Sequence, residues 1–153
     1  WRIKMAFTLF KEEYTKRMND GPFFETTDET AEFISTLYDD SIKGGVSTNG
    51  GTLLTGNKAG LVEQLKIGLS SEVPSLLFFE SQLSLGLLAY WTAGVLTNGS
   101  TVVTPGLPIP PNTFSNADTI EDFLGNFENA FSIHYSGAAG MLATTPWAGY
   151  NVP

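Results

Sequence analysis

The chain has 153 residues, 42% of them apolar, which suits one domain that can bury most of its unfolded surface without a disulfide or a metal. Its formal net charge of −8 argues against nucleic acid or an anionic membrane as a direct partner, because both favour clustered lysine and arginine. The chain contains no cysteine, which excludes disulfides, thiolate zinc sites and iron–sulfur clusters within it.

The basic residues are placed unevenly along the chain. Most of them lie near the amino terminus, and none follows Lys66. The rest of the chain therefore offers no lysine for a Schiff base and no arginine to grip a phosphate. We predict that residues 1–25 form an amino-terminal arm or lead-in helix, with a helix from about Ala6 to Met18 that ends before Gly21-Pro22.

Three later segments open with side chains that can accept hydrogen bonds from the free N–H groups of a helix start. These openings are Thr26 to Thr30, Thr55 to Lys58, and Ser115 to Asp118. In each case apolar residues follow at spacings of three and four, as in Phe33, Leu37 and Tyr38 after the first opening. The pattern predicts three amphipathic helices, and convergence on good capping chemistry explains their similarity more simply than duplication does.

A fourth helix is predicted from Ser75 to Leu96, where the chain is apolar nearly all round. A helix without a polar face is typical of a buried position, so we expect this one at the centre of the fold. The sequence therefore predicts an all-α protein, a bundle of four to five helices around this central apolar helix. The helical domain is expected over residues 26–135.

Two long connections and the carboxyl-terminal tail are rich in glycine or proline. The connection from Gly44 to Gly56 is predicted to be irregular, and the one from Asn98 to Asn112 to follow a stiff, extended path along the surface. The tail, residues 136–153, carries Trp147 and Tyr150, and large aromatic side chains are rarely left free in solvent. We expect it to dock, as an irregular segment, on its own domain or on a neighbour.

His134 is the only histidine, so sites that need two histidines are excluded within this chain. A dyad of His134 with Ser132 or Ser136 is conceivable, but neither serine lies in a Gly-x-Ser-x-Gly context. We interpret His134 as a structural residue, a cation at the end of a helix near the negative end of its dipole. The paired acids, such as Asp39-Asp40 and Glu121-Asp122, diverge on a helix by about 100° and do not converge on one ligand. No catalytic, cofactor-binding or metal-binding residue is therefore predicted.

Two distinctive motifs carry a resemblance to a known class of proteins. The first is Leu87-Leu88-Ala89-Tyr90-Trp91-Thr92-Ala93-Gly94, and the second is the Val-Thr-Pro-Gly-x-Pro loop at Val103 to Pro108. With the amphipathic helix that ends at His134 and with Pro146-Trp147, their order resembles small virion proteins of large tailed bacteriophages. The resemblance covers about Thr30 to Val152, and none of its motifs is a catalytic signature. It implies a non-enzymatic structural role in a head, neck or tail assembly.

The sequence thus predicts an acidic structural protein of the virion that forms homo-oligomers and contacts other virion proteins, without a cofactor. Residues expected to contribute to interfaces are Arg2, Lys4, Tyr90, Trp91, Pro105, Pro108, Pro110, Pro111, Trp147 and Tyr150. Two alternatives stay open at this point. One is a small acidic enzyme that uses paired carboxylates, and the other is a monomeric binding or adhesin-like module that uses the proline-rich loop.

Overall fold

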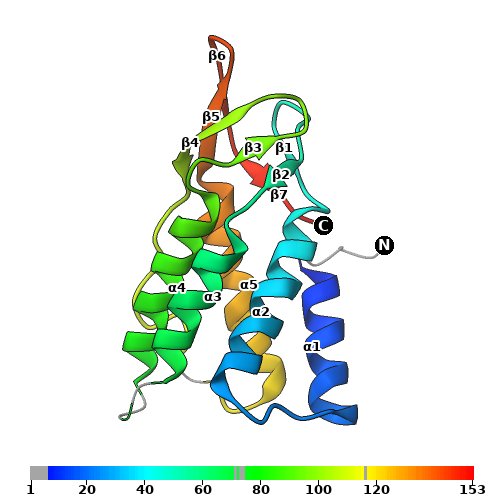
Figure 1. Cartoon of the computed structure of the whole chain (residues 1–153), viewed down its shortest axis with the longest axis vertical. Coiled ribbons are helices and arrows are strands. Elements are labelled where there is room, and N and C mark those ends of the chain that lie inside the picture. Colours follow the sequence, from blue (N-terminus) through cyan, green and yellow to red (C-terminus); the bar gives the residue numbers. More distant parts are fainter. Residues whose placement is uncertain (1–6, 71, 73–74, 116) are drawn as a thin grey trace.

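The computed structural model describes residues 7–70, 72, 75–115 and 117–153, so the interface candidates Arg2 and Lys4 lie outside the described residues. The described helices are α1 (Thr8–Asp20), α2 (Thr27–Ile42), α3 (Lys58–Leu69), α4 (Leu76–Trp91) and α5 (Ile120–Ser136). The strands are β1 (Val46–Ser47), β2 (Leu53–Thr55), β3 (Val95–Leu96), β4 (Thr101–Pro105), β5 (Ala138–Leu142), β6 (Thr145–Ala148) and β7 (Tyr150–Asn151). Helices and strands occupy opposite ends of the molecule (Figure 1).

The all-α prediction is wrong, because the protein is mixed. Five strands form an antiparallel sheet in the order β2-β3-β4-β5-β6, and β1 pairs with β7. Most of these strands come from the two connections and the tail, which were predicted to lack regular strands, and β3 comes from the end of the helix predicted from Ser75 to Leu96. They are two to five residues long, and several of their partners are distant in sequence, as in the pairing of Thr101 with Met141. Such short segments contain too few residues for a period of two to be recognised.

Two of the hairpins share a sequence pattern that the predicted helices and loops did not include. Gly-Val-x-Thr-Asn-Gly-x-Thr occurs at residues 45–52, after α2, and again at residues 94–101, after α4. Gly50 and Gly99 occupy the turns with φ of +88° and +85°, a conformation that favours glycine. An Asn-Gly pair flanked by Val and Thr is the strongest local signal for a hairpin, and it was available in the sequence.

The two Asn-Gly hairpins bind each other side by side. Asn49 Nδ2 donates to Ser100 Oγ at 2.8 Å, and the N–H of Thr97 donates to the carbonyl of Thr52 at 2.8 Å. Asn98 Nδ2 donates to the carbonyl of Asn49 at 3.4 Å. These contacts hold β2 beside β3 and make the strand end one continuous body.

The helical end is held by an aromatic cluster that joins α1, α2 and α5. Phe10 of α1 lies 5.3 Å from Phe131 of α5, measured between ring centroids, and Tyr38 of α2 lies 4.8 Å from the same ring. All three rings are buried. Burial of large aromatic side chains is the main source of stability in such a core.

Helix α4 is not the enclosed centre that its composition suggested. It packs on α3, where a Cβ on Gly86 would come within 2.8 Å of Leu61 Cδ1, so the small residue sets the close approach of these helices. The helix ends at Trp91, and its opposite face is open to solvent, with Leu77, Leu85 and Leu88 exposed. The chain between α4 and Leu96 turns into β3 rather than continuing the helix.

The capping prediction fits two of the three helices at the residue level. Thr26 accepts from the N–H of Glu29 at 3.2 Å, and Asn57 accepts from the N–H of Gly60 at 3.0 Å. The third helix begins later than predicted, because Thr119 caps α5 by accepting from the N–H of Asp122 at 3.1 Å.

Candidate interaction surface

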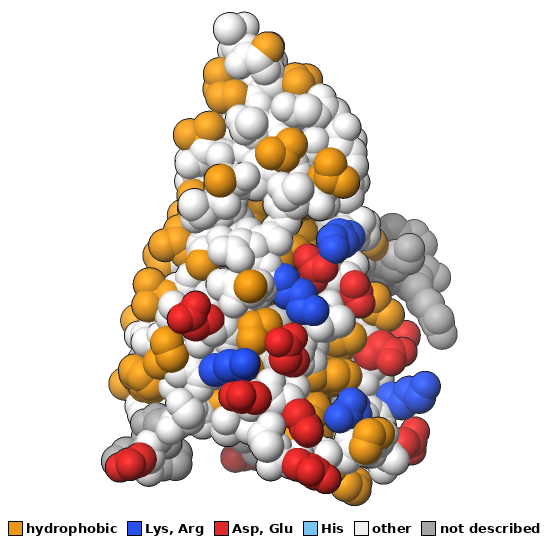
Figure 2. Space-filling model, viewed as in Figure 1, with side chains coloured by type: hydrophobic (Ala, Val, Ile, Leu, Met, Phe, Trp, Pro, Cys, Tyr) orange, Lys and Arg blue, Asp and Glu red, His pale blue; other side chains and the backbone are white. Residues whose placement is uncertain are grey.

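Charged residues are separated from the strands of this protein. We define the uncharged β end as residues 44–57, 92–107 and 137–153, which comprise β1 to β7 and their turns. None of these residues is Asp, Glu, Lys, Arg or His. In Figure 2 the acidic and basic side chains lie on the helical part, and the projecting part above it is free of them in this view. The charged side chains that the structure describes therefore lie outside the uncharged β end.

The uncharged β end also exposes apolar side chains, which are Val46, Leu54, Val103, Leu107 and Leu142. They lie among threonine, serine and asparagine residues that remain neutral at any physiological pH. The depletion of charge and the presence of apolar side chains are features of the central part of protein–protein interfaces. Figure 1 shows that the β5–β6 hairpin projects furthest from the helices.

The edges of the five-stranded sheet are poorly suited to adding a further strand. Strand β6 lies at one edge and contains Pro146, which has no N–H to donate. Strand β2 lies at the other edge, and its Leu53 N–H already donates to Tyr150 Oη at 3.0 Å. Contacts at this end therefore depend on side chains more than on strand pairing.

Four of the aromatic interface candidates lie inside the protein. Tyr90 and Trp91 are buried between the helices and the β end, and Trp147 and Tyr150 are buried under the strands of the tail. Trp91 donates from Nε1 to Tyr38 Oη at 2.8 Å, and Tyr150 Oη donates to the carbonyl of Ile42 at 2.7 Å. Their apolar surface is therefore used within one chain, and the tail docks on its own domain.

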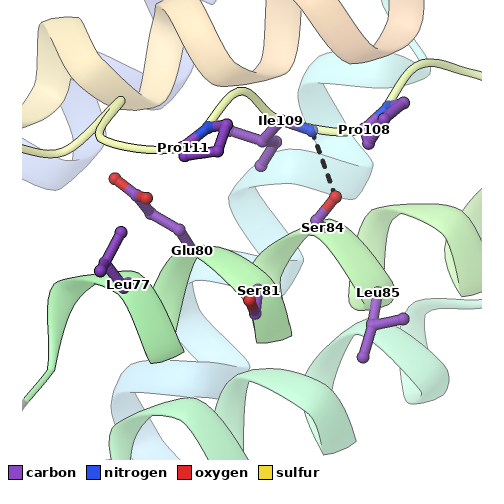
Figure 3. A pocket seen from close by; sticks show the side chains of 8 residues that line it. All are labelled: Leu77, Glu80, Ser81, Ser84, Leu85, Pro108, Ile109 and Pro111. Carbon is purple, nitrogen blue, oxygen red and sulfur yellow. Dashed lines mark hydrogen bonds between the residues drawn. The ribbon is translucent and has the colours of Figure 1, made fainter.

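The proline candidates lie on the surface, beside a groove. Pro108, Pro110 and Pro111 are exposed, and Pro105 is half-buried at the end of β4. Figure 3 shows the loop of Pro108 to Pro111 running along α4, with Ser84 and Glu80 pointing from the helix toward it. The N–H of Ile109 donates to Ser84 Oγ at 3.2 Å, which ties the loop to the helix.

Glu80 is buried at this groove but serves a structural purpose. One carboxylate oxygen accepts from the N–H of Phe114 at 2.6 Å, and the other accepts from the N–H of Asn112 at 2.9 Å. A buried carboxylate whose two oxygens each accept an N–H has hydrogen-bond partners that compensate for its loss of water. The bonds fix the end of the proline-rich loop against α4.

His134 also holds a loop in place, but as a buried side chain whose burial disfavours the charged form, and not as the helix-end cation predicted from the sequence. Its side chain is 1% exposed, and Nδ1 lies 2.7 Å from the carbonyl oxygen of Leu107. In the neutral ring Nδ1 must therefore carry the proton and donate it to that carbonyl. Burial lowers the pKa of His134 below its usual value of 6.5, although the carbonyl groups of Leu107, Pro105 and Leu87 act in the opposite direction.

The serines considered for a dyad do not bind His134. Ser132 Oγ lies 3.4 Å from Tyr135 Oη, and Ser136 Oγ donates to the carbonyl of Ile133 at 3.1 Å. Asp39 of the paired acids lies elsewhere and accepts from Tyr90 Oη at 2.6 Å. Among the residues that the structure describes, no three His, Cys, Asp or Glu side chains are grouped so that they could hold a metal ion.

None of the described helices combines the length and the apolar character needed to cross a membrane. Comparison with known protein families, with curated proteins and with solved structures finds no match for this chain. The geometry defines a mixed helical and β protein whose described charged side chains lie at the helical end, with an uncharged, partly apolar surface at the other.

Proposed function

We propose that this protein is a non-enzymatic structural component of a tailed-phage virion that acts through repeated protein–protein contacts. The single observation that carries the proposal is the separation of charge, because the uncharged β end exposes five apolar side chains and contains no charged side chain. Neighbours can pack against such an end without removing charged groups from water, which would cost several kcal/mol per ion. The virion setting rests on the resemblance of the apolar helix and the proline-rich loop to virion proteins.

The internal binding of the loops supports the same proposal. Side-chain hydrogen bonds from Asn49 and Asn98 join the two Asn-Gly hairpins, and Glu80 and His134 hold the proline-rich loop. A surface that is rigid before binding loses little conformational entropy when a neighbour packs on it. The uncharged β end is therefore suited to contacts that repeat in the same geometry from copy to copy.

The proposal is tested on purified particles of the phage that encodes the chain. Quantitative mass spectrometry should find the protein in a fixed, stoichiometric number of copies per particle. Its absence from purified particles would reject the virion role.

A pair of variants then tests which surface is used. Val103→Glu places a charge on the uncharged β end, at a side chain that is already exposed, and should lower incorporation into particles about tenfold or more. Asn19→Glu adds the same charge to the exposed surface of α1 and should be incorporated normally. Equal incorporation of both variants would show that the uncharged β end is not the contact surface.

A second candidate is a monomeric binding module, and the groove beside the proline-rich loop favours it. The groove is lined by Leu77, Ser81, Leu85, Pro108 and Pro111, among others, and it presents both apolar and hydroxyl groups. A module of this kind would be monomeric and absent from particles. The particle analysis and the oligomeric state therefore distinguish the two candidates.

A further inference from the structure

Helix α4 exposes a regular apolar seam on the side that faces away from the core. We define the α4 seam as Phe78, Ser81, Leu85, Leu88 and Thr92, which are separated by three, four, three and four residues. Phe78 is 37% exposed, Leu85 49% and Leu88 43%, and Ser81 and Thr92 are also exposed. Alternation of three and four residues is the spacing of a helix that packs along another helix.

The other side of α4 already has its partners. Leu83, Leu87 and Tyr90 are fully buried in the core, and Gly86 contacts α3. The α4 seam is thus an additional apolar face, and it is why the helix is apolar all round although it is not enclosed. A seam of this kind in contact with water favours burial against a second apolar helix.

No exposed charge accompanies the seam on its helix. The only charged residue of α4 is Glu80, which is buried and accepts the N–H groups of Asn112 and Phe114. The positions that flank the seam are held by Leu77, Gln82, Ser84 and Ala89, which are uncharged. In paired helices, charges at these flanking positions select or repel particular partners. Identical copies of α4 therefore meet no like-charge repulsion along it.

We propose that the α4 seam binds the α4 seam of a second copy of this chain. Copies with a net charge of −8 repel one another through most of their helical surface, and α4 is the helix that presents no exposed charge. Leu85 stands at the middle of the seam, so a two-fold axis beside it would bring the Leu85 side chains of both copies together. A two-fold contact uses the same surface patch of both copies.

The groove beside the seam extends the contact area. Leu77, Ser81 and Leu85 line it from α4, and Pro108 and Pro111 line it from the loop, so the helix of a second copy would touch both. A stable interface takes about 800 Å² from each partner, which is roughly a tenth of the 8220 Å² surface of this chain. Figure 2 shows apolar side chains along the margin where Figure 1 places α4.

The test compares the oligomeric state of the full chain with that of two variants. Sedimentation at protein concentrations from about 1 to about 100 μM should reveal a dimer, and Leu85→Glu should raise its dissociation constant about tenfold or more. Phe23→Glu is the matched control, because Phe23 is exposed in the α1–α2 connection and outside the seam. A wild-type chain that stays monomeric, or a dimer that Leu85→Glu leaves intact, would overturn the proposal.

A cross-linking experiment tests the geometry independently of affinity. The chain has no cysteine, so a single introduced thiol has no competitor. Leu85→Cys should form an intermolecular disulfide on mild oxidation, while Asn19→Cys on the charged surface of α1 should not. Equal yields from the two variants would mean random collision and would reject the seam.

This inference deepens the proposed function and rests on it for its biological setting, but the two can fail separately. A dimer in solution with no protein in purified particles would retain the α4 contact and reject the virion role. A stoichiometric virion protein that is monomeric in solution and does not cross-link through Leu85→Cys would reject the contact and retain the role.

Discussion

Tyr90 of α4 donates a hydrogen bond from its hydroxyl to Asp39 Oδ1 of α2 at 2.6 Å, in the interior of the protein. The other carboxylate oxygen of Asp39 pairs with Lys43 Nζ at 2.6 Å. Burial, as the larger cause, and the hydrogen bond to Asp39 raise the pKa of the Tyr90 phenol. The Tyr90 hydroxyl therefore stays a neutral donor. The charge of Asp39 is thereby held in place by one neutral and one cationic partner.

Removing the Tyr90 hydroxyl tests the strength of this contact. Tyr90→Phe should lower the free energy of unfolding by about 1.5 to 3 kcal/mol, because a nearly buried carboxylate oxygen loses its donor. Tyr135→Phe is the control, since its hydroxyl contacts Ser132 at 3.4 Å and the backbone of Val152 and serves no carboxylate. Urea denaturation of both variants measures the difference, and equal losses would show that the Asp39 contact adds little.

Replacement by alanine should change the stability of the protein in opposite directions at two glycines. A Cβ on Gly140 would lie 1.7 Å from the carbonyl oxygen of Thr101 and 2.9 Å from Trp147 Nε1, so Gly140→Ala forces β5 away from β4. We expect a loss of about 1 to 3 kcal/mol or more. Gly125 in α5 has open space at that position, and Gly125→Ala should stabilise the protein by about 0.5 to 1 kcal/mol. Thermal unfolding of the pair checks both signs.

The buried His134 should make stability depend on pH. Burial lowers the pKa of His134 in the folded protein below 6.5, so the unfolded chain binds a proton first as the pH falls. The contribution of His134 to the free energy of unfolding is complete above pH 6.5. It is lost as the pH falls from 6.5 toward the pKa of His134 in the folded protein, by up to about 1.4 kcal/mol per pH unit.

The measurement is urea denaturation of the wild type and His134→Gln between about pH 7.5 and pH 5. Gln can still donate to the carbonyl of Leu107, so the fold should survive the change. The stability difference between the two proteins should shrink or reverse at the lower pH. A difference that is constant across this range would contradict a neutral, buried His134.

The tail should contribute a large share of the stability through Trp147. This side chain is buried against β5 and lies across from Gly140, so Trp147→Ala should cost about 3 to 5 kcal/mol. Pro146→Ala changes the neighbouring residue of β6, whose side chain is exposed, and should cost less than about 1 kcal/mol. Comparable losses in the two variants would mean that the tail is weakly docked.

The sequence by itself determined the helices and their starts most reliably. Thr26 and Asn57 are capping residues because their short side chains accept a hydrogen bond from the N–H three residues later, in the first turn of the helix. This is a local property that does not depend on distant contacts. The distribution of charge was equally readable, since it follows from composition along the chain. The Asn-Gly hairpins also have a local signal in the sequence, although Asn49-Gly50 and Asn98-Gly99 were predicted to lie in loops.

Only the tertiary structure decided the fold class and the position of the aromatic side chains. Several of the short strands exist because partners distant in sequence complete their hydrogen bonds, as in the pairings of Leu53 with Leu96 and of Thr101 with Met141. The burial of Trp91 and Tyr150 and the exposure of Leu85 depend likewise on which elements cover them. The sequence shows only that an apolar residue can be buried. The packing of the whole chain decides which apolar residues remain on the surface.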